Sequence, residues 1–327
     1  MSGKMGKSLP CAAVSLLVLL ATSQPAVVSA SGSGRRPRYH SIFSFGDSFS
    51  DTGNKPVAFG WYSLPSNVMR PPYGSTFFGH PTGRSSDGRL VLDLVADCLG
   101  LPFVPPFLAH NGSLDFAGGA NFAVAGATAL DAGFFHGRDI PSAASKFPLN
   151  TSLNVQLQWF ESLLPSLCGT AQECKEFLGG SLFFVGEFGV NDYNLLMKKM
   201  SLQQVRSFAP VVVTTITMAI ERMIKLGAKS IVVPGVVPSG CSPPVLTFFA
   251  DGRAGEADYD AVTGCLRDVN ELGVHHNSLL RLALRELRCR HPDSTIVYAD
   301  FFRPVMDMVE SPREFGERFG RCQDDDD

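Results

Sequence analysis

The chain has 327 residues and a net charge of −3, and 45% of its residues are hydrophobic. This hydrophobic content is enough for a large core, and the length is long for one domain without clearly indicating two. No basic stripe runs through the sequence, so nothing in it indicates a nucleic-acid partner.

The first 30 residues have the pattern of a secretory signal peptide. Lys4 and Lys7 precede an apolar run from Ala12 to Ala21, and residues 28–30 (Val-Ser-Ala) fit the small-x-small pattern before a cleavage point. The run is too short to span a bilayer, although an uncleaved anchor is the alternative interpretation. No later segment looks long and apolar enough to span a membrane. We therefore expect a soluble, secreted, extracellular protein.

Short apolar runs that predict strands alternate with helix-like segments along the rest of the chain. The predicted strands are Ser41–Phe45, Ser181–Gly186, Ser230–Pro234 and Thr295–Asp300. The predicted helices are Leu90–Leu99, Leu153–Leu164, Ser201–Leu226 and a long one from about Asp258 to Arg288. This alternation is typical of an α/β fold in which helices cover both faces of a parallel sheet.

Two loop-rich insertions interrupt the alternation. Lys55–Asp87 is rich in proline, glycine and aromatic residues, and Asp131–Asn150 is a second insertion of this kind. Such loops commonly form the rim of a pocket, but they could equally be inert surface.

Seven cysteines remain after the signal peptide, so at least one thiol has no internal partner. In an oxidising compartment we expect the bridges Cys168–Cys174 and Cys241–Cys265, because each pair encloses a short polar loop. The sequons at Asn111 and Asn150 predict glycosylation and agree with secretion.

Several catalytic motifs are absent from the sequence. It contains no Gly-x-Ser-x-Gly elbow, no His-Glu-x-x-His, no Cys-x-x-Cys and no phosphate-binding glycine-rich loop before a helix. We therefore expect no metal catalysis.

Three segments carry groups suited to acyl transfer, which needs a nucleophile, a base and donors for the oxyanion. Ser48 follows the first predicted strand, at the edge of the sheet where ligands bind in open α/β folds. Gly119 lies in a glycine-rich segment whose N–H groups could approach a substrate closely, and Asn191 follows the strand Ser181–Gly186. Taken singly, these residues could be a helix cap, a turn and a loop.

Together and in this order, the segments FGDSFSDTGN, GGANFAVAGA and GVND resemble the first three motif blocks of the plant GDSL esterase/lipase family of SGNH hydrolases. The resemblance extends from about Tyr39 to about Phe319. It implies a flavodoxin-like three-layer α/β/α sandwich, hydrolysis of carboxylic esters without a cofactor, Ser48 as nucleophile, and Gly119 and Asn191 in the oxyanion hole. The expected partner is a small-molecule, cell-wall or lipid ester.

The fourth block of that family is an Asp-x-x-His whose histidine activates the serine, and this chain contains no Asp-x-x-His. The resemblance assigns the His275-His276 pair to a non-catalytic position, and His291 precedes the strand that ends at Asp300, on the wrong side of the sheet. His80 and His136 lie in the two insertions and are the remaining substitutes for the base.

The sequence after the segment FFRPVMDMVESPREFG departs from the family pattern. Cys322 resembles the first cysteine of a loop that precedes the Asp-x-x-His block, and residues 321–327 are an acidic tail unlike the family. We expect residues 31–320 to form a hydrolase domain that is truncated before its last helix. The hypotheses are a serine ester hydrolase, an inactive truncated glycoprotein that binds esters or glycans, and an incomplete gene model of a normal enzyme.

Overall fold

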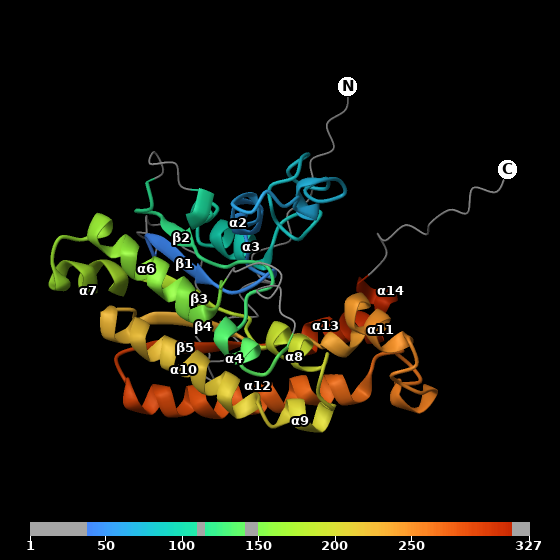
Figure 1. Cartoon of the computed structure of the whole chain (residues 1–327). Helices are drawn as coiled ribbons and strands as arrows, with labels where there is room; N and C mark the ends of the chain where they lie inside the picture. Colours follow the sequence, from blue (N-terminus) through green and yellow to red (C-terminus); the bar gives the residue numbers. More distant parts are fainter. Residues whose placement is uncertain (1–37, 110–114, 141–149, 316–327) are drawn as a thin grey trace.

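The computed structural model describes residues 38–109, 115–140 and 150–315 (Figure 1). Five parallel strands form one sheet in the order β2-β1-β3-β4-β5. The strands are β1 (Ser41–Phe45), β2 (Gly119–Asn121), β3 (Ser181–Val185), β4 (Ser230–Pro234) and β5 (Thr295–Ala299). The predicted parallel α/β architecture is therefore confirmed.

Four of these strands were predicted within one residue of their bounds, because each is a short apolar run flanked by turn residues, and β1, β3 and β4 are almost completely buried. The exception is β2, which has only three residues and begins at a glycine. Its segment looks like a turn in the sequence, since glycine is depleted in strands. The neighbouring strand β1 nevertheless pairs with it in parallel register.

The helices lie between the strands in chain order. They are α2 (Asn54–Gly60), α3 (Val91–Cys98), α4 (Ala132–His136), α6 (Leu153–Leu167), α7 (Ala171–Gly179), α8 (Val190–Leu196), α9 (Leu202–Arg206), α10 (Ala209–Leu226), α11 (Pro243–Ala250), α12 (Arg267–Arg290), α13 (Phe302–Glu310) and α14 (Pro312–Phe315). The segment predicted as one helix from Ser201 to Leu226 is thus two helices. Pro210 stands in the first turn of α10, where a missing N–H is tolerated.

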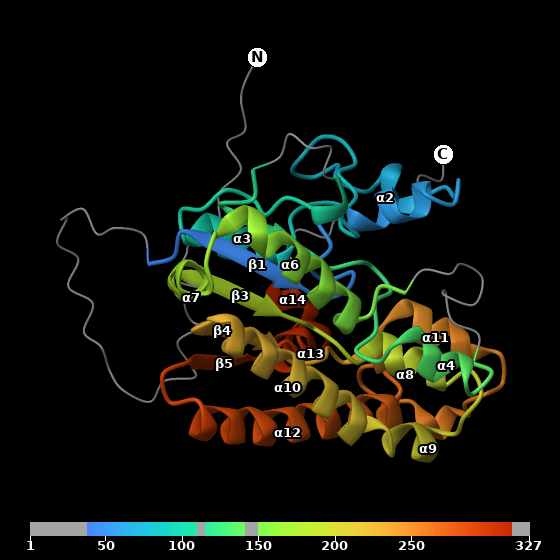
Figure 2. The same cartoon turned by 60° about the vertical axis from the view of Figure 1, so that its left-hand side comes forward.

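The two faces of the sheet bury separate cores, as expected when helices cover both. Phe43, Phe183 and Ile231 point to one face and pack with α6, α10 and α12. Ile42 and Leu182 point to the other face and pack with α3. Figures 1 and 2 show α10 and α12 side by side on the first of these faces. The arrangement is a three-layer α/β/α sandwich.

The expectation that no segment after the signal peptide is long and apolar enough to span a membrane was wrong. The helical stretch Leu202–Leu226 is long and apolar enough to cross a membrane by length and composition alone. In the structure, however, the α10 side chains Val212, Ile216 and Ile220 are buried in the core. A core helix of an α/β sandwich is apolar for this reason, so the composition of α10 follows from its packing.

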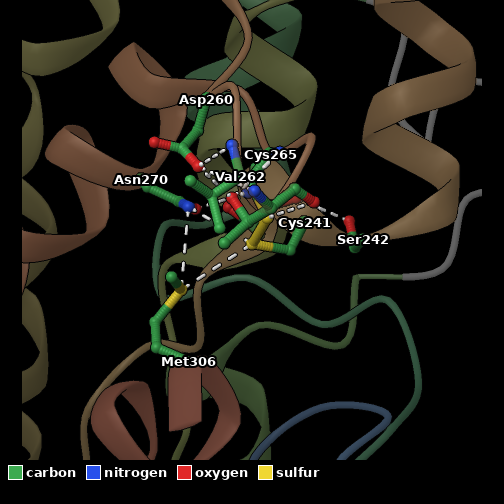
Figure 3. The surroundings of a disulfide bond; sticks show 10 residues. Cys241, Ser242, Asp260, Val262, Cys265, Asn270 and Met306 are labelled. Atoms are coloured by element: carbon green, nitrogen blue, oxygen red, sulfur yellow. Dashed lines mark hydrogen bonds between the residues drawn. A yellow bond between two sulfur atoms is a disulfide. The ribbon is translucent and has the colours of Figure 1, made fainter. Parts of the chain in front are cut away.

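Both expected disulfides are present, Cys168–Cys174 and Cys241–Cys265. The second joins the loop after β4 to the segment just before α12 (Figure 3). Asn270 of α12 accepts a hydrogen bond from the N–H of Gly240, and its amide contacts the sulfur of Cys241 at 3.3 Å. The disulfide therefore fixes the start of α12 against the carboxyl end of the sheet.

The insertion Lys55–Asp87 is tied to the sandwich by an ion pair near its end. Arg84 donates to both carboxylate oxygens of Asp93 in α3, at 2.7 and 2.8 Å, and both side chains are buried. A third nitrogen of Arg84 lies 3.4 Å from the carbonyl oxygen of Thr52, four residues after Ser48. The insertion is thereby held next to the loop that carries Ser48.

Candidate active site

Ser48 lies in a tight turn immediately after β1, and its side chain is half-buried. The amide of Gln156 in α6 binds both backbone groups of Gly46, at 3.0 and 2.8 Å. The hydroxyl of Ser50 donates to the carbonyl oxygen of Gly186 at 3.0 Å. Bonds on both sides of Ser48 therefore fix the turn, while neither its backbone N–H nor its hydroxyl has a hydrogen-bond partner within the described part of the chain.

The structure places Gly119 away from Ser48, which argues against its predicted role as an oxyanion donor. Gly119 pairs with Ile42 near the beginning of β1, and its N–H already donates to the carbonyl oxygen of Phe116 at 2.9 Å. The three residue steps from Ile42 to Phe45 alone span about 10 Å of strand. Gly119 has a positive φ of 109° and packs closely against β1.

Gly126, at the end of the same glycine-rich segment, lies on the side of Ser48. The N–H of Val124 donates to the carbonyl oxygen of Gly46, and the N–H of Ala125 donates to the Asp51 carboxylate at 2.8 Å. Gly126 itself is exposed, has a φ of 92°, and its N–H has no partner among the described residues. The sequence-based expectation did not include Gly126, although a second glycine after an apolar run is a usable signal.

Asn191 lies in the first turn of α8, and the structure brings its side chain to the Ser48 turn. Its amide donates to the carboxylate of Asp47 at 2.6 Å and to the carbonyl oxygen of Ala127 at 3.0 Å. Asn191 thus connects the residue before Ser48 to the residue after Gly126. The three segments predicted from the sequence meet here, with Gly126 in place of Gly119.

Buried polar side chains hold the three segments together. Asp51 accepts hydrogen bonds from the N–H groups of Gly53, Asn54, Lys55 and Ala125. Asn121 donates to the carbonyl oxygen of Ser50 and to the hydroxyl of Thr52, and Asn54 donates to the carbonyl oxygens of Asn121 and Ala123. Asp192 accepts from the N–H groups of Ala129 and Leu130. Each link fixes backbone rather than substrate, so these residues position the site.

Burial perturbs the acidic groups around the turn. It raises the pKa of Asp47 and that of Asp51 to about 6, and the pKa of Asp192 to about 7. Burial also raises the pKa of Glu187 well above its ordinary value, and the neighbouring Asp47 carboxylate adds to the effect. Four buried acids within two adjacent loops are an unusual concentration, and none of them lies in an ion pair of the described chain.

No hydrogen bond joins a histidine to Ser48 in the residues that the structure describes. His276 is buried and its Nδ1 lies 2.7 Å from the hydroxyl of Tyr193. His291 precedes β5, at the edge of the sheet opposite Ser48. His80, a predicted substitute, is exposed and contacts the carbonyl oxygen of Phe78; His136, the other, is exposed at the end of α4. Neither is brought to the serine.

Two further expectations concern the surface and metals. Asn150 is exposed, whereas Asn111 lies outside the described residues, as does Cys322. Within residues 38–109, 115–140 and 150–315, no three His, Cys, Asp or Glu side chains are grouped so that they could hold a metal ion.

Comparison with known proteins agrees with this arrangement. Residues 42–326 match the sequence model of a family described as GDSL-like lipase/acylhydrolase. A sinapine esterase of Brassica napus is 42% identical over 298 residues, which cover 89% of this chain and 73% of that protein. Two GDSL esterase/lipases of Arabidopsis thaliana are each 42% identical, over 303 residues (92% of this chain, 76% of the relative) and 283 residues (85% and 74%).

The matched region includes all five strands and the loops that carry Ser48, Gly126 and Asn191. The parallel three-layer sandwich and the meeting of these loops at the carboxyl ends of its strands agree with that match. The chain belongs to the GDSL-like lipase/acylhydrolase family and is, by family, a carboxylic ester hydrolase.

Proposed function

We propose that this chain is a secreted serine ester hydrolase in which Ser48 attacks the ester carbonyl. The observation that carries the proposal is the contact of Asn191 with both Asp47 and Ala127, at 2.6 and 3.0 Å. It gathers the Ser48 hydroxyl, the backbone N–H groups of Ser48 and Gly126 and the Asn191 amide at the carboxyl end of β1. Open α/β sheets bind ligands at this edge.

The proposed chemistry proceeds in two steps. The oxygen of Ser48 bonds to the carbonyl carbon while its proton passes to a base, and the carbonyl oxygen becomes negatively charged. The free N–H groups of Ser48 and Gly126 are the proposed donors to that oxygen. The Asn191 amide becomes a third donor when it releases one of its two hydrogen bonds, to Asp47 or to Ala127. The C–O bond then breaks, the alcohol leaves with a proton, and water hydrolyses the acyl-enzyme in the same way.

The proposed chemistry needs a general base, and none is identified among the 327 residues. The chain has no Asp-x-x-His, and the described histidines lie away from Ser48. Without a base, neutral serine is a poor nucleophile, and removing the base of a triad costs several powers of ten in rate. We therefore propose that this 327-residue chain turns esters over slowly unless a base is added.

Imidazole in the solvent can replace the missing base. It therefore tests the role of Ser48 as nucleophile separately from the question of the base. We expect the chain to hydrolyse p-nitrophenyl acetate barely faster than Ser48→Ala. With added imidazole, the wild-type rate should rise above that of Ser48→Ala measured in the same buffer, which corrects for the reaction of imidazole itself. Equal rates for the two proteins with imidazole would contradict Ser48 as nucleophile. A fast, Ser48-dependent rate without imidazole would instead reveal a base, to be sought by replacing His80 and His136.

Secretion and substrate are further parts of the proposal. The signal-like residues 1–30 and the two disulfides support an oxidising, extracellular location. One relative is named as an esterase of sinapine, and we propose sinapine as the first natural ester to test. The relatives are named as esterases, which favours an ester hydrolase of low turnover over a binding glycoprotein without activity.

A further inference from the structure

Glu187 is buried in a way that a carboxylate does not tolerate by itself. The residue follows β3, and its exposed fraction is 0%. In the described part of the structure neither of its carboxyl oxygens has a hydrogen bond of ordinary geometry, although the Asp47 carboxyl group and the N–H of Val190 lie close enough to act on its pKa. Burying a lone carboxylate is strongly unfavourable, so such a group takes up a proton. Nothing in the proposed chemistry uses this side chain, although it lies four residues before Asn191.

The pairing of β1 with β3 places Glu187 beside Asp47. Phe45 pairs with Val185 in parallel register, and the two acids each stand two residues further along. The loops touch, because a Cβ on the glycine before Asp47 would lie 2.6 Å from the carbonyl oxygen of the glycine before Glu187. Asp47 is accordingly the charge that acts most strongly on Glu187.

Asp47 in turn determines the geometry on both sides of Ser48. One of its oxygens accepts the N–H of Phe49 at 2.9 Å, and the other accepts the amide of Asn191 at 2.6 Å. The Asp47 side chain is 1% exposed, so water does not replace these contacts. The charge on Asp47 is therefore both the anchor of Asn191 and a negative charge close to the place where the oxyanion would form.

We propose that Glu187 is a positioning residue that carries a proton and shares it with Asp47, so that one negative charge, spread over two carboxyl groups, holds Asn191 beside Ser48. The inference rests on the proposed role of Ser48. Two adjacent buried carboxyl groups do not both ionise readily, because the second charge repels the first. Loss of the shared proton places a second negative charge beside the oxyanion site and weakens binding there.

The other ionisable groups around the pair do not supply a compensating positive charge. Asp51, in the loop after β1, and Asp192, in α8, are acids that act on Asp47. The pKa of Tyr193 in α8 is raised by burial and, to a smaller extent, by Asp192 and Glu187. Its partner His276, in α12, stays neutral because burial lowers its pKa to about 3. The proton on Glu187 is thus the means of limiting the negative charge at this site.

Phenylboronic acid tests this inference without catalytic turnover. The oxygen of Ser48 adds to boron, its proton goes to solvent, and the tetrahedral boronate anion occupies the oxyanion site. Its dissociation constant would be measured by calorimetry from pH 5 to pH 9 for the wild type, Glu187→Gln and the control Glu286→Gln. Glu286 is an exposed residue of α12. The titration of the boronic acid itself cancels in the ratio between proteins.

Glutamine stays neutral at every pH, so we expect the affinity of the wild type relative to Glu187→Gln to fall about tenfold as the pH rises from 5 to 9, which corresponds to a coupling of about one pKa unit between Glu187 and the bound anion. Glu286→Gln should follow the wild type throughout. Glu187→Ala also removes the titrating carboxyl group, so its affinity for phenylboronic acid should not show the decline at high pH either. It replaces Glu187→Gln in the experiment if that variant does not fold.

The same measurement distinguishes the two proposals. Identical pH profiles for the wild type and the folded Glu187 variants would overturn the role of Glu187. If the wild type binds phenylboronic acid no better than Ser48→Ala at any pH, the proposed role of Ser48 fails instead. A purely structural role of Glu187 would lower the stability of its variants without removing the high-pH decline in affinity.

Discussion

Gly119 and Gly126 belong to one glycine-rich segment, yet their surroundings differ completely. A Cβ on Gly119 would lie 1.9 Å from the carbonyl oxygen of Ile42, inside the sheet. A Cβ on Gly126 would meet no atom within 4 Å. Close packing therefore requires the first glycine, whereas open space for a ligand surrounds the second. The two residues separate a structural role from the proposed role in the oxyanion hole.

Alanine at each position gives opposite results if this assignment is right. We expect Gly119→Ala to lower the free energy of unfolding by more than about 3 kcal/mol, because backbone and strand must both shift. Gly126→Ala should cost only about 1–2 kcal/mol, for its positive φ, but lower the imidazole-assisted, Ser48-dependent esterase rate about tenfold. Urea unfolding and the ester assay measure the two effects.

Gly60→Ala is the control, since no atom lies within 4 Å of a Cβ there and its φ is ordinary. Gly60→Ala should change neither the free energy of unfolding nor the esterase rate by more than the experimental error. A folded Gly119→Ala with a lost rate, beside a fully active Gly126→Ala, would reverse the assignment of the two glycines.

The sequence alone could locate the Ser48 and Asn191 loops, because each follows a strand whose run of apolar residues is unmistakable. It could not decide between Gly119 and Gly126. That choice depends on the register of β2 against β1, and three residues of β2 carry no periodic pattern from which a register follows. The raised pKa of Glu187 was equally out of reach, since it arises from burial in the folded protein and from Asp47, a neighbour 140 positions away in the chain.

At the scale of elements, ion pairs of very different burial hold the insertion Lys55–Asp87 and the segment after it. Arg84 and Asp93 are almost completely buried, with side-chain exposures of 8% and 0%. Arg89 pairs with Asp97 at 3.3 Å, where the Asp97 side chain is 59% exposed. Aromatic rings lie against both arginines, Phe78 for Arg84 and Phe77 for Arg89. Comparing the two pairs therefore shows how burial changes the contribution of an ion pair to stability.

Arg84→Ala should cost about 3–5 kcal/mol, because it leaves the buried Asp93 carboxylate without its partner. Arg89→Ala should cost at most about 1 kcal/mol, as is usual for exposed pairs. The free energy of unfolding in urea measures both, and limited proteolysis of residues 55–87 should detect release of the insertion in Arg84→Ala only. Equal small costs for the two variants would mean that the insertion is held by other contacts.

Element boundaries were predictable to the degree that local chemistry sets them. The capping serine and threonine before α6 and α7 accept the N–H groups that a helix leaves free, and α6 begins at its predicted residue. The long helix was predicted to begin at about Asp258 but begins at Arg267. The Cys241–Cys265 bridge and the tight turn around Asp260 hold the preceding residues in a loop, which is a tertiary constraint on an otherwise helix-like sequence.

At the scale of the whole molecule, the buried acids make stability depend on pH in an unusual direction. Asp47, Asp51 and Asp192 have ordinary pKa values near 3.8 when unfolded and values of about 6, 6 and 7 when folded. The folded state therefore binds more protons than the unfolded state between about pH 4 and pH 7. Stability is greatest at the acidic end of this window and is lost as the pH rises through the folded pKa values.

His276 acts in the opposite direction over part of this window. Its pKa is about 3 when folded, so below pH 6.5 the unfolded state binds the additional proton and stability rises with pH. One histidine offsets only one of the acids, and above pH 6.5 it contributes no slope. The acids therefore determine the net trend, and Glu187 acts in the same direction because burial raises its pKa well above its ordinary value.

We expect the free energy of unfolding in urea to fall between pH 5 and pH 7.5, and Asp192→Asn to reduce that fall. A pKa raised from 3.8 to about 7 corresponds to about 4 kcal/mol over the full window, of which roughly half or more lies above pH 5. Asparagine keeps only one acceptor for Ala129 and Leu130, so the variant should be less stable at every pH. The slope, rather than the absolute stability, is the diagnostic quantity. Asp251→Asn, at an exposed site, should retain the wild-type slope, and a wild type that gains stability from pH 5 to pH 7.5 would show that these acids are ionised in the folded protein.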